Sequence, residues 1–185
     1  MKRVLRYGAI GLAVLVLALA AAVFVIGRFA DGPVGPIAGG PLRGGELTSL
    51  PAEGWPIQGG AQVELQLVEP PHSRTTGALS YRGQLYIPCD LGFIWRRLPS
   101  GGMRAIARVL WAVKHWHEDA LRDGRVVLRF AGKRYAGQAV RVEDPATLAV
   151  LRGIMEERAA SYMHATLTNA PADPDAIWFF RIDPR

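Results

Sequence analysis

Residues 114–119, KHWHED, hold the densest group of side chains in this chain that could do chemistry. Two histidines flank a tryptophan, a lysine precedes them and two carboxylates follow. Such a group could bind a metal, transfer protons or line a ligand site. On a helix, His115 and His117 would point about 200° apart, so they could not share a metal from one face. The carboxylates favour the start of a helix here, and we expect no metal site.

Cys89 is the only cysteine, so an intramolecular disulfide is impossible. Cys89 and His115 would make a thiol–imidazole pair if the fold brought them together. No nucleophile motif surrounds Cys89, and a cysteine after a strand is more often a small buried apolar residue. The catalytic residues, if any, stay unassigned, and a thiol or metal site at Cys89 is the weakest hypothesis.

The charge of the chain is unevenly distributed. Lys and Arg number 22 against 16 Asp and Glu, a net charge of +6, and Lys2, Arg3 and Arg6 account for half of it. The remaining surplus is too small for the basic stripe that nucleic-acid binding requires. We therefore expect no nucleic-acid partner.

Residues 7–27 contain no charged side chain. As a helix, about 20 residues at roughly 1.5 Å each span the ~30 Å hydrocarbon layer of a bilayer. Residues 1–28 therefore predict a transmembrane anchor that contacts lipid through residues 7–27. The cations before the span, with only Arg28 close behind it, predict a single-pass protein of the inner (plasma) membrane. Its N-terminus would be cytoplasmic and its globular part extracytoplasmic, facing the periplasm of a two-membrane bacterium.

A cleaved signal peptide is the competing hypothesis for this segment. The apolar run is longer than a typical signal core and ends in VFVIGRFADG, without a clean small-x-small cleavage site. These features favour an uncleaved signal anchor.

Residues 29–60 are dominated by glycine and proline and cannot sustain a helix or a central strand. We predict an arm that joins the anchor to a domain at residues 61–185. Isolated apolar side chains along the arm indicate that it docks on the domain instead of hanging free: Val34, Ile37, Leu42, Leu47 and Trp55.

Strand patterns dominate residues 61–142. Residues 61–70 alternate apolar and polar side chains, which predicts a half-buried strand. Residues 77–88 predict a hairpin around Arg82-Gly83, with Pro88 ending its second strand. Residues 125–130 and 134–142 predict a second hairpin, in which Gly137 indicates a bulge or a sharp bend of the kind found in barrels.

Helix signals and one further strand complete the domain. Asp144 and Pro145 open a helix that runs to about Tyr162, with an apolar stripe at Leu148, Leu151, Ile154 and Met155. We also predict a turn near residues 93–98, helices over 103–113 and 116–122, and a strand over 176–182. The fold class is therefore α+β: a small antiparallel β-barrel with two or three helices, preceded by one transmembrane helix.

Residues 114–145 resemble the second half of the split β-barrel proteins that bind flavins and deazaflavins. These are the pyridoxamine-phosphate-oxidase-like barrels and the deazaflavin-dependent nitroreductase relatives. The shared pattern is His115 and Trp116 before a short helix, then a strand, a glycine-centred turn, a strand ending in Asp144-Pro145, and a helix. Residues 73–89 resemble the earlier hairpin of that family. The segment CDLGFIWRRLPSGG lacks the glycine-rich phosphate loop of the deazaflavin-binding members.

The resemblance covers about residues 61–182 and implies a planar cofactor, FMN or a deazaflavin, between barrel and helices, often across a homodimer. Aromatic residues could stack on its ring and basic residues could meet its anionic group. The candidate cofactor-binding residues are Arg74, Tyr81, Arg96, Arg97, Lys114, His115 and Trp116.

Two hypotheses follow for function. The first is a membrane-anchored split-barrel protein that binds a flavin-like or other anionic planar ligand and could act as an oxidoreductase. The second is a non-enzymatic envelope module without a cofactor. Such a module would assemble with itself or with another membrane protein through the barrel face and the arm.

Overall fold

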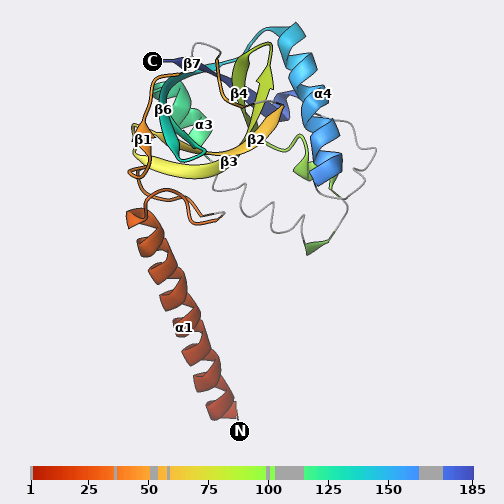
Figure 1. The fold of residues 1–185 in the computed structure, drawn as a ribbon. Helices are drawn as coiled ribbons and strands as arrows, with labels where there is room; N and C mark the ends of the chain where they lie inside the picture. The colour runs from red at the N-terminus through yellow and green to blue at the C-terminus, as the bar shows by residue number, and fades with distance from the viewer. Residues whose placement is uncertain are drawn as a thin grey trace.

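A computed structural model describes residues 2–35, 37–50, 54–57, 59–98, 101–102, 115–162 and 173–185 (Figure 1). The described strands form one sheet in the order β1-β6-β5-β2-β3-β4-β7, and β6 also pairs with β7. That last pairing closes six of the strands into a barrel, as predicted. The strands are β1 Glu46–Leu47, β2 Gly60–Leu67, β3 His72–Tyr81, β4 Gln84–Asp90, β5 Arg125–Phe130, β6 Lys133–Arg141 and β7 Ile177–Pro184.

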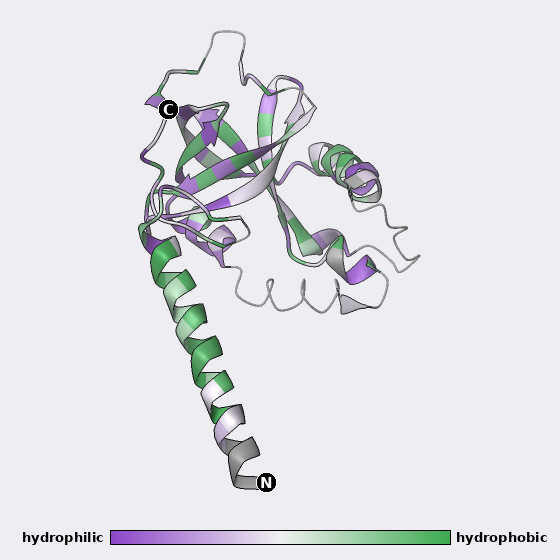
Figure 2. Cartoon of the chain, turned by 60° about the horizontal axis from the view of Figure 1, so that its bottom comes forward, coloured by the Kyte–Doolittle hydropathy of each residue, from purple (hydrophilic) through white to green (hydrophobic). Residues whose placement is uncertain are grey.

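The N-terminal helix α1, Lys2–Phe29, projects away from the barrel. Its stretch Ile10–Phe29 is long and apolar enough to cross a membrane, and its side chains are almost all exposed. Figure 2 shows the apolar residues running along most of the helix. A helix that is exposed and apolar on every side fits the hydrocarbon layer of a bilayer in length and composition. The structure therefore contains the predicted N-terminal helix, long and apolar enough to be a candidate membrane span.

The barrel interior is filled by side chains that alternate along the strands. In β2, Val63, Leu65 and Leu67 point inward and are buried, whereas the residues between them are not. At one end of the barrel the Trp116 ring lies 5.3 Å from Phe180 of β7. Further along β7, Trp55 of the arm donates from Nε1 to the carbonyl of Ile182, at 3.2 Å. Two tryptophans thus fill the barrel from its two ends.

Helix α4, Pro145–Tyr162, covers the outer face of the barrel (Figure 1). The backbone N–H of Thr147 donates to the Asp144 carboxylate at 2.8 Å, which confirms the predicted cap. Leu151 is fully buried against outward-facing residues that include Leu79 and Phe179. The rest of the predicted apolar stripe packs around this cluster: Leu148, Ile154 and Met155.

The prediction that Pro88 ends its strand is wrong. β4 continues to Asp90, and Pro88 pairs with Phe179 of β7. β3 pairs with β4 only as far as Tyr86, so beyond this point β4 has lost its neighbour on one side. A residue without an N–H is tolerated at such an open edge.

Gly137 does not form a bulge between β5 and β6, because the register of that pair continues through it without a break. A Cβ at this position would lie 2.7 Å from Cγ2 of Ile182. Glycine is therefore required because β7 approaches β6 closely where the barrel closes.

The connecting elements agree with the sequence where they are described. The 3₁₀ helix η1, Trp95–Arg97, lies in the predicted turn, and α3, Trp116–Arg122, is the predicted short helix. Ala131 and Gly132 both have positive φ, at 49° and 75°, as a two-residue hairpin turn requires. The helix predicted over 103–113 lies outside the described residues.

The arm docks on the barrel through some of the predicted side chains. Leu42 and Trp55 are buried, whereas Val34 and Leu47 are exposed. Glu46 and Leu47 form β1, which pairs in parallel with the start of β6. The glycine-rich stretch is thus part of the folded unit.

Candidate functional site

The structure brings two of the predicted site residues together at the α3 end of the barrel. Arg74 occupies a position of β3 opposite Leu65 of β2, and its guanidinium lies 5.4 Å from the centre of the Trp116 ring. Trp116 is the first residue of α3, and His115 precedes it as an exposed residue. A guanidinium over an indole face is a favourable cation–π arrangement.

Burial lowers the pKa of Arg74 to about 10, although the nearby negative charge of Asp119 opposes this shift. Within the described part of the chain, no carboxylate forms an ion pair with Arg74, and Asp119 pairs with Arg122 instead. A desolvated cation without an ion-pair partner is costly, so this position favours an anionic group.

Trp116 carries a buried indole N–H at the same end of the barrel. The side chain is only 2% exposed, and its Nε1–H has no acceptor among the described residues. Its ring is covered by Arg74 on β3 and packed near Phe180, so it plugs the barrel end. The ring is therefore not an open stacking face, and its indole N–H is a buried donor without an acceptor among the described residues.

A second arginine–tryptophan stack lies at the same end and was not predicted. The guanidinium of Arg141 lies 3.9 Å from the centre of the Trp178 ring, and His117 meets that ring edge-on at 4.9 Å. Because His117 follows Trp116 in α3, this short helix connects the two stacks. The inward positions of β7 could have indicated Trp178, but nothing in the sequence pairs it with Arg141.

The other described candidate residues lie elsewhere, and their role in ligand binding stays a prediction. Tyr81 packs against the outer cluster under α4, and Arg82 lies over its ring at 5.2 Å. Arg96 pairs with Asp173 at 3.4 Å. Lys114 lies outside the described residues.

Arg97 forms an ion pair with Glu156 of α4 at 2.6 Å. Its guanidinium also lies 5.9 Å from the ring of Phe93. These contacts hold η1 against α4, so the charge of Arg97 is balanced within the fold.

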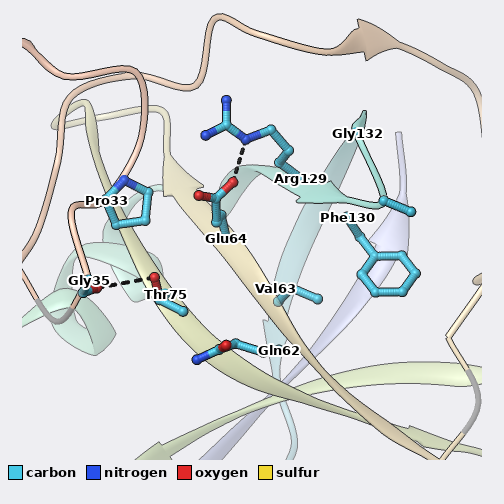
Figure 3. Close-up of a pocket in the computed structure, with 10 residues that line it drawn as sticks. Pro33, Gly35, Gln62, Val63, Glu64, Thr75, Arg129, Phe130 and Gly132 are labelled. Atoms are coloured by element: carbon cyan, nitrogen blue, oxygen red, sulfur yellow. Dashed lines mark hydrogen bonds and ion pairs between the residues drawn. The ribbon is translucent and has the colours of Figure 1, made fainter.

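A cavity of about 500 Å³ lies between the arm and the outer face of the barrel (Figure 3). Arg129 of β5 pairs there with Glu64 of β2 and, at 2.9 Å, with Asp31 of the arm. The hydroxyl of Thr75 also donates to the carbonyl of Gly35, at 3.3 Å. The single arginine pairs with two carboxylates, so these three groups hold the arm and leave a net negative charge that disfavours an anion here.

Thiol and metal chemistry find little support in the geometry. Cys89 is buried in the barrel core, whereas His115 is exposed. In the part of the chain that the structure describes, no three or more His, Cys, Asp and Glu residues gather as a potential metal site.

Comparison with known proteins gives a weak similarity to a solved structure. No protein-family model matches the chain, and no curated protein matches it significantly. A crystal structure from Listeria innocua, provisionally described as a pyridoxamine 5′-phosphate oxidase, superposes with a TM-score of 0.41 and 15% identity over 70% of this chain and 85% of that one. At this level the match assigns neither a family nor a ligand, and the barrel is established by its own strand pairing.

Proposed function

We propose that this protein is a single-pass membrane protein whose barrel lies outside the cytoplasm and binds an anionic planar ligand at the α3 end. The anionic group would meet Arg74 and the indole N–H of Trp116. A flavin nucleotide is the first ligand class to test, because it combines a planar ring with a phosphate. When bound, a flavin would supply electron transfer, and the protein could then act as an oxidoreductase.

The single observation that supports this site is the state of Arg74. Its guanidinium is desolvated and stacked on Trp116, and no described carboxylate pairs with it. Two other partly buried arginines differ from it: Arg129 has two carboxylate partners, and Arg97 pairs with Glu156. The contrast favours an external anion at Arg74, since guanidinium groups bind phosphate and carboxylate by paired hydrogen bonds.

The proposed topology is supported by the distribution of cations around α1. Lys2, Arg3 and Arg6 precede the apolar stretch, and Arg28 is the only cation close after it. Such an excess keeps the N-terminus in the cytoplasm. A reporter enzyme that works only outside the cytoplasm, fused after Arg185, should be active. Activity of a cytoplasm-only reporter at the same position would contradict the topology.

Ligand binding is tested with the full chain in detergent micelles by titrating FMN and following flavin fluorescence. We expect saturable binding that Arg74→Gln weakens at least tenfold, which corresponds to about 1.4 kcal/mol. Arg82→Gln is the matched control, because its guanidinium also lies over an aromatic ring but on an exposed turn. No binding to the natural chain, or equal loss in both variants, would contradict the proposed site.

A second candidate function is a cofactor-free envelope assembly module. It is favoured by the filled interior, in which the rings of Trp55, Trp116 and Phe180 are all buried. The mass of the detergent-solubilised protein, measured by light scattering, separates the two candidates. A stable homodimer that binds no FMN would favour the assembly module.

A further inference from the structure

The last turn of α1 packs against the arm. Gly27 is buried, in contrast to its exposed neighbours Ile26 and Arg28. The backbone N–H of Gly40 donates to the carbonyl of Gly27 at 3.0 Å. A Cβ at Gly27 would lie 3.4 Å from Cγ2 of Ile37, so the side chain of Ile37 lies directly beside this turn. The arm therefore folds back along the end of the helix (Figure 1).

This contact fixes the position of Val34 and Ile37 along the direction perpendicular to the membrane. Gly27 lies within the apolar stretch Ile10–Phe29, two residues or about 3 Å before its end. Val34 and Ile37 exchange two backbone hydrogen bonds of 3.1 Å, and Val34 is 48% exposed. Two apolar residues of the arm thus lie at the level where the hydrocarbon layer would end.

A set of hydrogen bonds then connects the arm to the barrel. Gly39 and Ser73 of β3 exchange backbone hydrogen bonds of 2.9 and 3.0 Å, and the Ser73 hydroxyl donates to the carbonyl of Gly40 at 2.6 Å. Asp31, two residues after α1, pairs with Arg129 of β5. We call these five residues the clasp. Because its bonds run from the helix end to two barrel strands, anchor and barrel are held as one body.

The α3 end of the barrel lies on the same side as the anchor. The backbone N–H of Gly40 donates to Gly27 in the last turn of α1, and the carbonyl of Gly40 accepts from the hydroxyl of Ser73 near the start of β3. Arg74 follows Ser73 directly, so the proposed ligand site lies close to the end of the anchor.

We infer that Val34 and Ile37 form a second membrane contact, which inserts into the bilayer interface and seats the barrel on the lipid surface in a fixed orientation. The partner is the lipid interface itself, which accepts apolar side chains next to a transmembrane segment. The inference rests on the proposed membrane anchoring and extends it from the helix to the folded domain.

The test places single fluorescent labels on the full chain, with Cys89→Ala to remove the native thiol. Labels at Val34→Cys, Leu17→Cys and Val150→Cys report the second membrane contact, the middle of α1 and an exposed valine on α4. The protein is reconstituted into phosphatidylcholine vesicles whose lipids carry spin-label quenchers at a shallow or a deep position. We expect the shallow quencher to reduce emission at least twofold at residue 34 and to leave residue 150 unchanged, while the deep quencher acts at residue 17.

The outcomes separate the inference from the anchor on which it rests. Quenching at residue 17 but not at residue 34 would overturn the seating and leave the anchor intact. No quenching at residue 17 would overturn both.

The role of the clasp is tested on the residue 34 label with Arg129→Gln. We expect shallow quenching to fall at least twofold as the second membrane contact leaves its fixed position. Arg125→Gln is the matched control on the same strand, because Arg125 pairs locally with Asp123. Equal quenching in both variants and in the parent would overturn the fixed orientation.

Discussion

The guanidinium of Arg74 lies 5.4 Å from the centre of the Trp116 ring, whose buried indole N–H has no acceptor among the described residues. β3 supplies the cation and α3 supplies the indole, so the pair forms only when the short helix closes the barrel end. Native proteins normally pair buried donors. A half-buried cation beside an unsatisfied indole N–H favours an acceptor that comes from outside the fold.

Replacing Arg74 by methionine should separate stability from binding. The substitution removes a desolvated charge and keeps an unbranched side chain over Trp116, at the cost of a cation–π contact of about 1 kcal/mol. We expect the free energy of unfolding to stay within about 1 kcal/mol of the parent or to rise, while FMN affinity falls at least tenfold. Thermal unfolding followed by tryptophan fluorescence and the FMN titration test this together. A large loss of stability would instead make Arg74 a structural residue.

Acid should release the arm. The pKa of Asp31 is held below its ordinary value of 3.8 by a backbone hydrogen bond from Arg43, a second from Gly44 and the ion pair with Arg129. Burial of the carboxylate has the opposite effect. A carboxylate with a lowered pKa contributes stability that is fully present above pH 3.8 and is lost as the pH falls through the lowered pKa. The hydrogen-exchange protection factors of residues 39–47, relative to an unfolded peptide at the same pH, should therefore decrease as the pH falls below 3.8. Asp31→Asn should show fast exchange already at neutral pH, and slow exchange there would contradict the role of the carboxylate.

A methyl group at Gly39 should undock the arm. A Cβ there would lie 1.7 Å from the carbonyl oxygen of Gly32, which forces the backbone to move. We expect Gly39→Ala to destabilise the protein by roughly 1–3 kcal/mol, as overpacking does, and to expose residues 30–45 to protease. Gly77→Ala is the control, because its Cβ would meet nothing within 4 Å. Similar protease sensitivity in the two variants would show that the arm is not held by this close approach.

Local patterns predicted the elements whose causes are local. The Asp144 cap, the apolar stripe of α4, the hairpin turn at Ala131-Gly132 and the apolar stretch of α1 each depend on residues a few positions apart. Their capping, spacing and turn chemistry are visible in the sequence, and the structure shows each of them.

The features that the sequence did not predict depend on contacts between residues far apart in the chain. Pro88 remains within a strand because β3 and β4 diverge after Tyr86, and Gly137 is explained by the approach of Ile182. The same holds for the candidate site. Arg97 has a partner, Glu156, that lies 59 residues away in the chain, whereas Arg74 has no carboxylate partner among the residues that the structure describes. No local pattern distinguishes two such arginines, because the difference arises from tertiary contacts.

Cys89 should prove inert, which would remove the thiol hypothesis. Its side chain is fully buried in the barrel core, where the sulfur behaves as a small apolar group. We expect a maleimide reagent to label Cys89 only after denaturation, because reactivity requires an accessible thiolate. Cys89→Ala should lower the free energy of unfolding by about 1 kcal/mol, the cost of a small cavity, and leave FMN affinity unchanged. Rapid labelling of the folded protein, or loss of ligand binding in Cys89→Ala with stability retained, would instead place the thiol in the site next to Arg74.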